Sequence, residues 1–359
     1  MQDRFENGIF GMLSQEEWLE VGYDVTRPND PVDQIFGDVK TDNLIAYWES
    51  QAANYGLPVM AQYHAFDVEA KTTMRKPIDI HNIEKGLIKV KIPQTERLNV
   101  LRGKGVARES ELVKAVYNDG YNLADEVFTR SKVAKNEVLA TGKMTIKENN
   151  LDITIDYGVP AANLGLTLDF GAGASKGLSE QLLDIIEAAK AAGKPITGIY
   201  TSSAMISKMR KDTDLQVIIN GTGLSGRLIR KADLLDFLSS EYGITRVFEQ
   251  DGHYSLPLTI GENGRPATHD QRYYPIDRIS FFHADNKLGD GLWGDPPEVS
   301  AAKFMEVGES EVSPFVYVTQ YAENDPAVVW TKASGLFVPV IYDPNALYVA
   351  TAISTPLNA

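Results

Sequence analysis

A glycine-rich segment at residues 221–226 is the strongest candidate for chemistry in this sequence of 359 residues. Gly221, Gly223 and Gly226 have the G-x-G-x-x-G spacing, in which glycines let the backbone approach the pyrophosphate of a dinucleotide at the start of a helix. An apolar run at residues 217–219 precedes them, and Glu249 ends a later predicted strand. This order predicts an NAD(P)-dependent oxidoreductase as one hypothesis.

Two features of the surrounding sequence argue against a dinucleotide site. The polar Asn220 lies where the predicted strand should lead into the turn, and the helical pattern of residues 208–215 runs into that strand. The neighbouring sequence also lacks the alternation of strands and helices that completes a parallel sheet. Because an isolated glycine fingerprint matches many unrelated proteins, we favour a protein that is not an enzyme.

Other residues that could do chemistry lack the spacing that a site requires. In the glycine-rich residues 171–177, Lys176 precedes the final glycine instead of following it, which excludes the phosphate-binding Walker A loop. We interpret this segment as a loop, with Ser179 as the N-cap of the next helix. The chain has no cysteine, and no H-x-x-x-H or H-E-x-x-H spacing joins its five histidines, His64, His81, His253, His269 and His283. We therefore expect no catalytic residue, no metal and no cofactor.

The composition is that of an acidic, soluble protein with enough apolar residues for folded cores. Hydrophobic residues make up 43% of the chain, and 35 Lys and Arg stand against 49 Asp and Glu, which gives a net charge of −14. The length corresponds to about two domains. The longest apolar run, at residues 336–342, is too short for a membrane helix, and the first residues show no signal-peptide pattern. We expect folding in the cytoplasm and no membrane partner.

The charge is distributed unevenly along the chain. Residues 1–45 carry 3 basic and 10 acidic side chains, a net of −7, whereas residues 71–147 carry 16 basic and 9 acidic, a net of +7. Affinity for phosphate backbones comes mainly from Lys and Arg, so an acidic chain argues against gripping nucleic acid but not against enclosing it. A reversal of sign between two long segments indicates an assembly surface.

The N-terminal part predicts extended structure and then a long helix. Residues 1–45 alternate short apolar clusters with acidic and turn residues, as an extended arm does. Three strand-like stretches follow, at residues 57–63, 66–73 and 87–92. Apolar residues then recur every four or seven positions between Leu112 and Val138, which predicts a helix over residues 108–140.

The rest of the chain predicts a hairpin, a mixed α/β region and closing strands, so the fold class is α+β. The hairpin joins strands at residues 143–147 and 151–157 through a turn-forming E-N-N sequence. Helices are predicted at residues 179–192 and 232–242. Further strands are predicted at residues 196–200, 244–249, 279–283, 328–333, 336–341 and 347–353.

This order of elements resembles that of the major capsid proteins of tailed bacteriophages of the lambda type, the capsid protein E family, which has the Hong Kong 97-type fold. Three segments carry the resemblance: LATGK at residues 139–143, IDYGVP at 155–160, and ASGLFVPVIYDPNA at 333–346. The resemblance covers residues 45–353 and is weaker across the loops of the α/β region.

The resemblance implies a role for each part of the chain. The implied parts are an N-terminal arm (1–45), an extended loop or E-loop over a neighbouring subunit (46–100), a peripheral domain with a β sheet (101–160 and 331–359) whose spine helix is 108–140, and an α/β axial domain at five-fold and six-fold vertices (161–330). In this frame, residues 221–226 form a loop between two helices of the axial domain.

The resemblance also implies the function. Pentamers and hexamers of the chain would build the icosahedral shell of the virion, the phage head, which encloses double-stranded DNA without sequence-specific binding and without catalysis. Implied partners are further copies of the chain, a scaffolding protein during assembly, a portal at one vertex and, as an option, a decoration protein. Assembly would take place in the cytoplasm of the bacterial host. A nanocompartment shell of the same fold is the other alternative, distinguished by a dedicated cargo and assembly without scaffolding.

Apolar residues of the arm and of the β-rich segment have little core of their own, so we expect neighbouring subunits to cover them. These residues are Phe10, Trp18, Phe36, Leu57 and Phe66. The reversal of charge adds Lys71, Arg75 and Lys76 as expected contacts to the acidic arm of a neighbour. Pairs of this kind steer association more than they add affinity.

Overall fold

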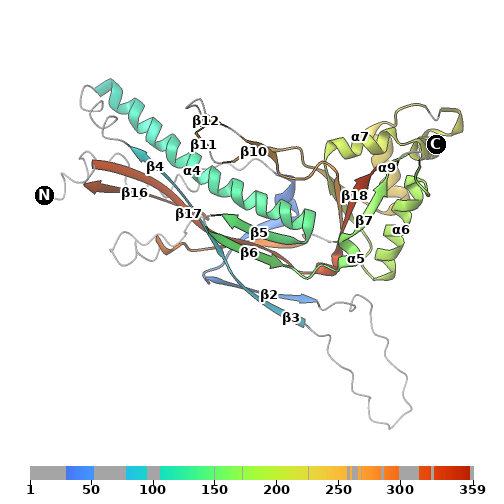
Figure 1. The fold of residues 1–359 in the computed structure, drawn as a ribbon, viewed down its shortest axis with the longest axis horizontal. Coiled ribbons are helices and arrows are strands. Elements are labelled where there is room, and N and C mark those ends of the chain that lie inside the picture. The colour runs from blue at the N-terminus through green and yellow to red at the C-terminus, as the bar shows by residue number, and fades with distance from the viewer. Residues whose placement is uncertain are drawn as a thin grey trace, which may run out of the picture.

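The structure of the chain is a computed structural model (Figure 1). It describes residues 30–51, 78–94, 106–148, 150–171, 173–224, 226–256, 259–260, 266–267, 269–283, 287–298, 315–324 and 327–355. These residues form two five-stranded sheets and a long helix, α4 (Val106–Thr141), that packs against both. The architecture therefore mixes helix and sheet, as the α+β prediction requires.

The first sheet extends along α4 (Figure 1). Its strands are, in the order in which they pair, β1 (Phe36–Lys40), β15 (Gly289–Gly294), β17 (Ala327–Ile341) and β16 (Tyr317–Asn324), with β4 (Gly86–Gln94) paired to β17 as well. The pair β1–β15 is parallel and the others are antiparallel. Because β17 pairs with β4 on one edge and with β16 and then β15 on the other, it is the central strand of this sheet.

The second sheet has the strand order β7 (Leu166–Asp169), β18 (Leu347–Ile353), β14 (Arg278–Phe282), β8 (Gly198–Thr201) and β9 (Arg246–Glu249). Its side chains alternate between two cores: Ile199 and Phe281 pack with helices on one face, whereas Tyr200 and Phe282 belong to the core around α4. The covering helices are α6 (Leu178–Ala191), α7 (Ser203–Lys211), α8 (Thr213–Asn220) and α9 (Lys231–Tyr242). The same chain therefore covers both faces of this sheet.

Smaller elements complete the described part. Four two-stranded ribbons are β2 (Ile45–Gln51) with β3 (Ile78–Glu84), β5 (Lys143–Glu148) with β6 (Leu151–Asp156), β10 (His253–Ser255) with β13 (Asp270–Arg272), and β11 (Thr259–Ile260) with β12 (Pro266–Ala267). The short helices are η1 (Pro31–Gln34), α5 (Ala161–Leu164), η2 (Thr222–Leu224) and η3 (Pro344–Ala346).

The long helix predicted over residues 108–140 is confirmed as α4, which has 36 residues. At 1.5 Å per residue it is about 54 Å long. The apolar stripe that predicts it faces the core, since Leu123, Val127, Ala134 and Val138 are all buried. Gly142 follows the helix with a φ of +69°, a conformation that favours glycine and turns the chain into β5.

Hydrogen bonds hold the C-terminal end of α4 on the second sheet. The Tyr200 hydroxyl donates to Asn136 Oδ1 over 2.6 Å, and the Ser280 hydroxyl donates to the Leu139 carbonyl, also over 2.6 Å. The Arg278 guanidinium donates to the carbonyl of Ala140 over 2.6 Å. The helix is therefore fixed at this end by buried polar contacts in addition to apolar packing.

The predicted hairpin, the two predicted helices and the strand at residues 87–92 are confirmed, with small shifts at their ends. The two strands predicted at residues 328–333 and 336–341 are wrong in one respect, because they form the single strand β17. Gly335 continues the strand where little space remains: a Cβ there would lie 3.1 Å from the Trp293 ring and 3.2 Å from Val127 Cγ1. The strands predicted at residues 57–63 and 66–73 lie outside the described residues.

Two strands belong to a different sheet from the one that the implied domain boundaries suggest. β15 falls within the implied axial range 161–330, yet it pairs with β1 and β17 in the first sheet. β18 falls within the implied peripheral range 331–359, yet it pairs with β7 and β14 in the second sheet. Pairing between segments that are far apart in the sequence decides which sheet each strand joins, and local sequence patterns do not reveal this pairing.

The end of the implied N-terminal arm belongs to the core of its own subunit. Val32, Ile35 and Phe36 are fully buried there, and β1 pairs along β15. This corrects the expectation for Phe36, because a side chain that its own chain covers does not need a neighbouring subunit to cover it.

Candidate assembly interface

The glycine-rich segment at residues 221–226 does not have the geometry of a dinucleotide site. The residues 217–219 that precede it belong to helix α8, not to a strand, and Gly221 ends that helix with a φ of +84°. Added Cβ atoms on Gly221, Gly223 and Gly226 would meet nothing within 4 Å, so no close packing explains these glycines. The segment connects α8 to α9, which corrects the strand–turn–helix hypothesis and agrees with a loop between two helices.

The interpretation of Ser179 as an N-cap is also wrong. Gly177 occupies the N-cap position of α6 and provides no side-chain cap, so an acceptor for the first turn comes from another helix. The Ser179 backbone N–H donates to Asp214 Oδ2 over 2.9 Å, and its hydroxyl donates to the same oxygen. Asp214 lies in the first turn of α8, so this carboxylate joins the starts of two helices.

Among the described residues, no group of three or more His, Asp or Glu side chains is arranged to hold a metal ion. His283 Nδ1 lies 2.6 Å from the Pro195 carbonyl, a contact between two chain segments. No helix within the described ranges is long and apolar enough to cross a membrane.

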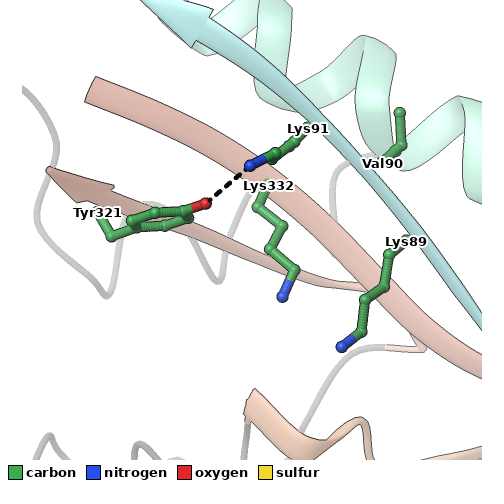
Figure 2. A pocket seen from close by; sticks show the side chains of 5 residues that line it. All are labelled: Lys89, Val90, Lys91, Tyr321 and Lys332. Atoms are coloured by element: carbon green, nitrogen blue, oxygen red, sulfur yellow. Dashed lines mark hydrogen bonds between the residues drawn. The ribbon is translucent and has the colours of Figure 1, made fainter. Parts of the chain in front are cut away.

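The strands β4, β17 and β16 form the outer half of the first sheet, and one face of this half is turned away from α4. Cross-strand neighbours in β4, β17 and β16 place Lys91 beside Lys332, and Trp330 beside Tyr321. Because side chains alternate along a strand, these residues share one face. Figure 2 shows the lysines on that side and Val90 directed to the other side. Val90 is one of the partly buried residues that pack against the core around α4.

This face contains a hollow of about 350 Å³, lined by Lys89, Val90, Lys91, Tyr321 and Lys332 and called the lysine hollow below (Figure 2). Sequence reasoning missed it, although a signal was present. Lys89 and Lys91 are two positions apart in a predicted strand, which places both on one face. Only the pairing of β4 with β17 adds Lys332 to them.

Glu298 is the carboxylate that partly neutralises the lysine hollow. Its Oε1 lies 3.2 Å from Lys89 Nζ and forms a closer ion pair with Lys332 Nζ, while Oε2 accepts from the Ser334 hydroxyl over 3.0 Å. Desolvation opposes ionisation of Glu298, but the hydrogen bonds from Lys332 and Lys89 outweigh it and lower its pKa to about 2. Glu298 is therefore ionised at neutral pH.

Lys91 makes aromatic contacts on the same face. Its Nζ lies 3.9 Å from the centroid of the Trp330 ring and donates to the Tyr321 hydroxyl over 3.5 Å. Within the described ranges, no carboxylate pairs with Lys91. The Trp330 indole N–H is buried and has no acceptor among the described residues. The face thus offers positive charge and two aromatic rings.

A buried lysine on α4, Lys135, holds residues 30–40 onto the core. Its Nζ is almost fully buried and lies 2.6 Å from Asp33 and 3.0 Å from Asp38. At the start of the segment, Asp30 accepts from the Gln250 side chain over 2.8 Å and lies 3.9 Å from Lys132 Nζ. Residues 30–38 are therefore held on the core by polar contacts at both ends.

Several large apolar side chains are exposed on the ribbons. Leu44, Ile45 and Tyr47 lie at or next to β2, and Leu151 and Ile153 lie on β6; their exposed fractions range from 39% to 59%. Exposed apolar side chains gathered on a ribbon mark an interaction surface. Apart from Phe36, the predicted contact residues lie outside the described residues: Phe10, Trp18, Leu57, Phe66, Lys71, Arg75 and Lys76. For these seven residues, contact with neighbouring subunits stays a prediction.

The family model described as "phage major capsid protein E" matches residues 55–352. A search of curated proteins gives no match. The matched range includes α4, the second sheet as far as residue 352 of β18, and every strand of the first sheet except β1.

Several solved structures resemble the fold. A protein of an Escherichia coli CFT073 prophage, described as a capsid protein, has 14% sequence identity and a TM-score of 0.54, with 94% of this chain and 97% of that chain covered. A phage-related protein from Bordetella bronchiseptica RB50 has 9% identity and a TM-score of 0.49, with 93% and 95% covered. A Mycobacterium phage Bobi protein has 13% identity and a TM-score of 0.46, with 92% of each chain covered. The first of these supports the fold.

Proposed function

The chain belongs to the phage major capsid protein E family, and we propose that its copies assemble through pentamers and hexamers into an icosahedral shell around double-stranded DNA. The observation that carries this proposal is the family match over residues 55–352. The expected Hong Kong 97-type capsid fold is confirmed by the mixed architecture and by the likeness to the prophage capsid protein. The protein is a structural component of the phage head.

The surfaces described above support a role in association. A chain of this length with an open sheet face and exposed apolar ribbons gains stability when copies cover those surfaces. The net charge of −14 favours enclosing DNA without adhering to it, since like charges repel. The proposal includes no catalytic step.

The finer organisation is part of the proposal. The second sheet with its helices corresponds to the axial domain, and the first sheet with α4 corresponds to the peripheral domain and its spine. A scaffolding protein would guide assembly, a portal would occupy one vertex, and a decoration protein is an optional addition. Assembly in the bacterial cytoplasm agrees with a cysteine-free chain, which needs no oxidising compartment.

Electron microscopy of the chain, expressed with and without the proteins of its own phage, tests the proposal. Shells, tubes or rings of five and six copies are expected. Small discrete oligomers that bind a nicotinamide nucleotide would contradict it and favour the oxidoreductase hypothesis. Shells that form without scaffolding around a dedicated protein cargo would favour the nanocompartment alternative instead.

A further inference from the structure

The lysine hollow carries more positive charge than its own chain neutralises within the described residues. It contains three lysines, Lys89, Lys91 and Lys332, and Glu298 is the carboxylate that pairs with two of them. Lys91 instead contacts Tyr321 and the Trp330 ring. A ligand for this surface must therefore bring negative charge, and apolar or aromatic groups that pack against Tyr321 and Trp330.

The N-terminal segment of the chain has this chemistry. Residues 1–29 carry six acidic and two basic side chains. Within it, Glu16, Glu17 and Glu20 surround Trp18 and Leu19, so carboxylates and a large aromatic ring occur within five consecutive residues. The carboxylates match the lysines, and Trp18 matches the aromatic part of the surface.

We propose that the lysine hollow of one subunit binds the acidic segment around residues 16–20 of a second copy of the chain. This inference rests on the proposed function, because copies adjoin only in an assembly. Partial burial of Lys332, whose side chain is 20% exposed, strengthens its Coulomb attraction to a carboxylate. High salt weakens the contact, since part of the hollow is open to solvent.

Charge reversal with exchange of partners tests this contact. One variant carries K91E and K332E, which make the hollow acidic. The other carries E16K, E17K and E20K, which make the segment basic. Each variant alone is expected to give at least tenfold fewer particles than the native chain, because hollow and segment then repel each other. An equal mixture of the two is expected to recover particles, because the hollow of each variant then fits the segment of the other.

The mixture distinguishes a second copy from the same copy. If all five changes in one chain restore assembly but the mixture does not, the segment binds the hollow of its own subunit and the proposal is overturned. Normal assembly of both single variants also overturns it. The matched control reverses two exposed lysines elsewhere, K208E and K211E on α7, and is expected to assemble normally. Circular dichroism of the unassembled variants checks that each one folds.

Disulfide trapping gives a second readout that does not depend on particle yield. Because the native chain has no cysteine, introduced cysteines can pair only with each other. Chains with E17C and K332C are expected to form covalent dimers and longer species under oxidation, visible on a non-reducing gel. The proposal is overturned if the oxidised sample contains only monomers with an internal disulfide, or if no disulfide forms at all. If the native chain forms no particles at all, the proposed function fails, and the trapping result still reports on the contact.

Discussion

The two sheets of the molecule have five strands each, but they differ in how much of their surface the same chain covers. The second sheet lies between four helices on one face and the core around α4 on the other. The first sheet has α4 on one face, while its outer half presents the lysine hollow on the other. The chain therefore covers both faces of the second sheet itself, whereas it leaves part of one face of the first sheet open to a partner.

The largest effect on stability is expected from a substitution that creates a cavity at the second sheet. Phe281 on β14 is fully buried among the helices, so Phe281→Ala should lower the free energy of unfolding by about 3 to 5 kcal/mol. The matched change on the open face is Tyr321→Ala, where the side chain is 38% exposed and the cost should be about 0.5 kcal/mol. Denaturant unfolding of the unassembled chain measures both. Equal costs would show that the two sheets do not differ in this way.

The next effect concerns the buried lysine that joins the N-terminal segment to α4. Lys135→Ala removes the cation beside Asp33 and Asp38, and the remaining buried negative charge should cost about 3 kcal/mol. The control is Lys143→Ala, because Lys143 pairs with Asp156 over 2.7 Å at a half-exposed site where about 0 to 1 kcal/mol is expected. Thermal unfolding compares the two. If Lys135→Ala lowers the free energy of unfolding as little as the control does, residues 30–40 are not held by this charge cluster.

A smaller effect is expected at the junction of α4 with the second sheet. Tyr200→Phe removes the hydroxyl that donates to Asn136 Oδ1 and should cost about 1 to 3 kcal/mol, since a buried acceptor loses its partner. Burial raises the pKa of Tyr200 well above its usual value, so the hydroxyl keeps its proton and the cost should not depend on pH near neutrality. Tyr254→Phe is the control, because that hydroxyl donates to Gln271 at an exposed position. Unfolding curves at two pH values test both statements.

The smallest effect on stability is expected at the open face. The pKa of Glu298 is about 2 in the folded chain against an ordinary 4.5, so its ion pairs stabilise the fold above pH 4.5 and lose this effect as the pH falls toward 2. Glu298→Gln should remove this part of the pH dependence and cost about 1 kcal/mol at neutral pH, because the lysines are partly exposed. Acid titration of unfolding measures the change. A variant with an unchanged acid profile would contradict it.

Local patterns predicted the elements well where one face of an element is buried. The stripe from Leu123 to Val138 predicted α4 because a helix that packs along a sheet must repeat apolar residues at its own period. The E-N-N turn predicted the β5–β6 hairpin, and Asn150 takes the positive φ of 65° that this turn requires. These signals lie within a few residues of the structure that they determine.

The features that sequence reasoning missed depend on contacts between distant residues. Phe36 is buried because β1 pairs with β15, which lies more than 250 residues later in the chain. Ser179 lies inside the first turn of α6 and not at its N-cap, and its backbone N–H donates to Asp214 of another helix. The lysine hollow needs Lys332 from β17 beside Lys91 from β4. Single positions could be named from the sequence, but the partner of each could not.

The central strand β17 has a mechanical consequence. Its 15 residues span about 50 Å at 3.3 Å per residue, nearly the length of α4. From Val329 to Ser334 it is hydrogen-bonded on both edges, to β4 and to β16. A pull along this strand loads those bonds in shear, so many must break together, whereas a pull across it would open them one after another. A subunit under tension is therefore more resistant along the direction in which β17 runs than across it.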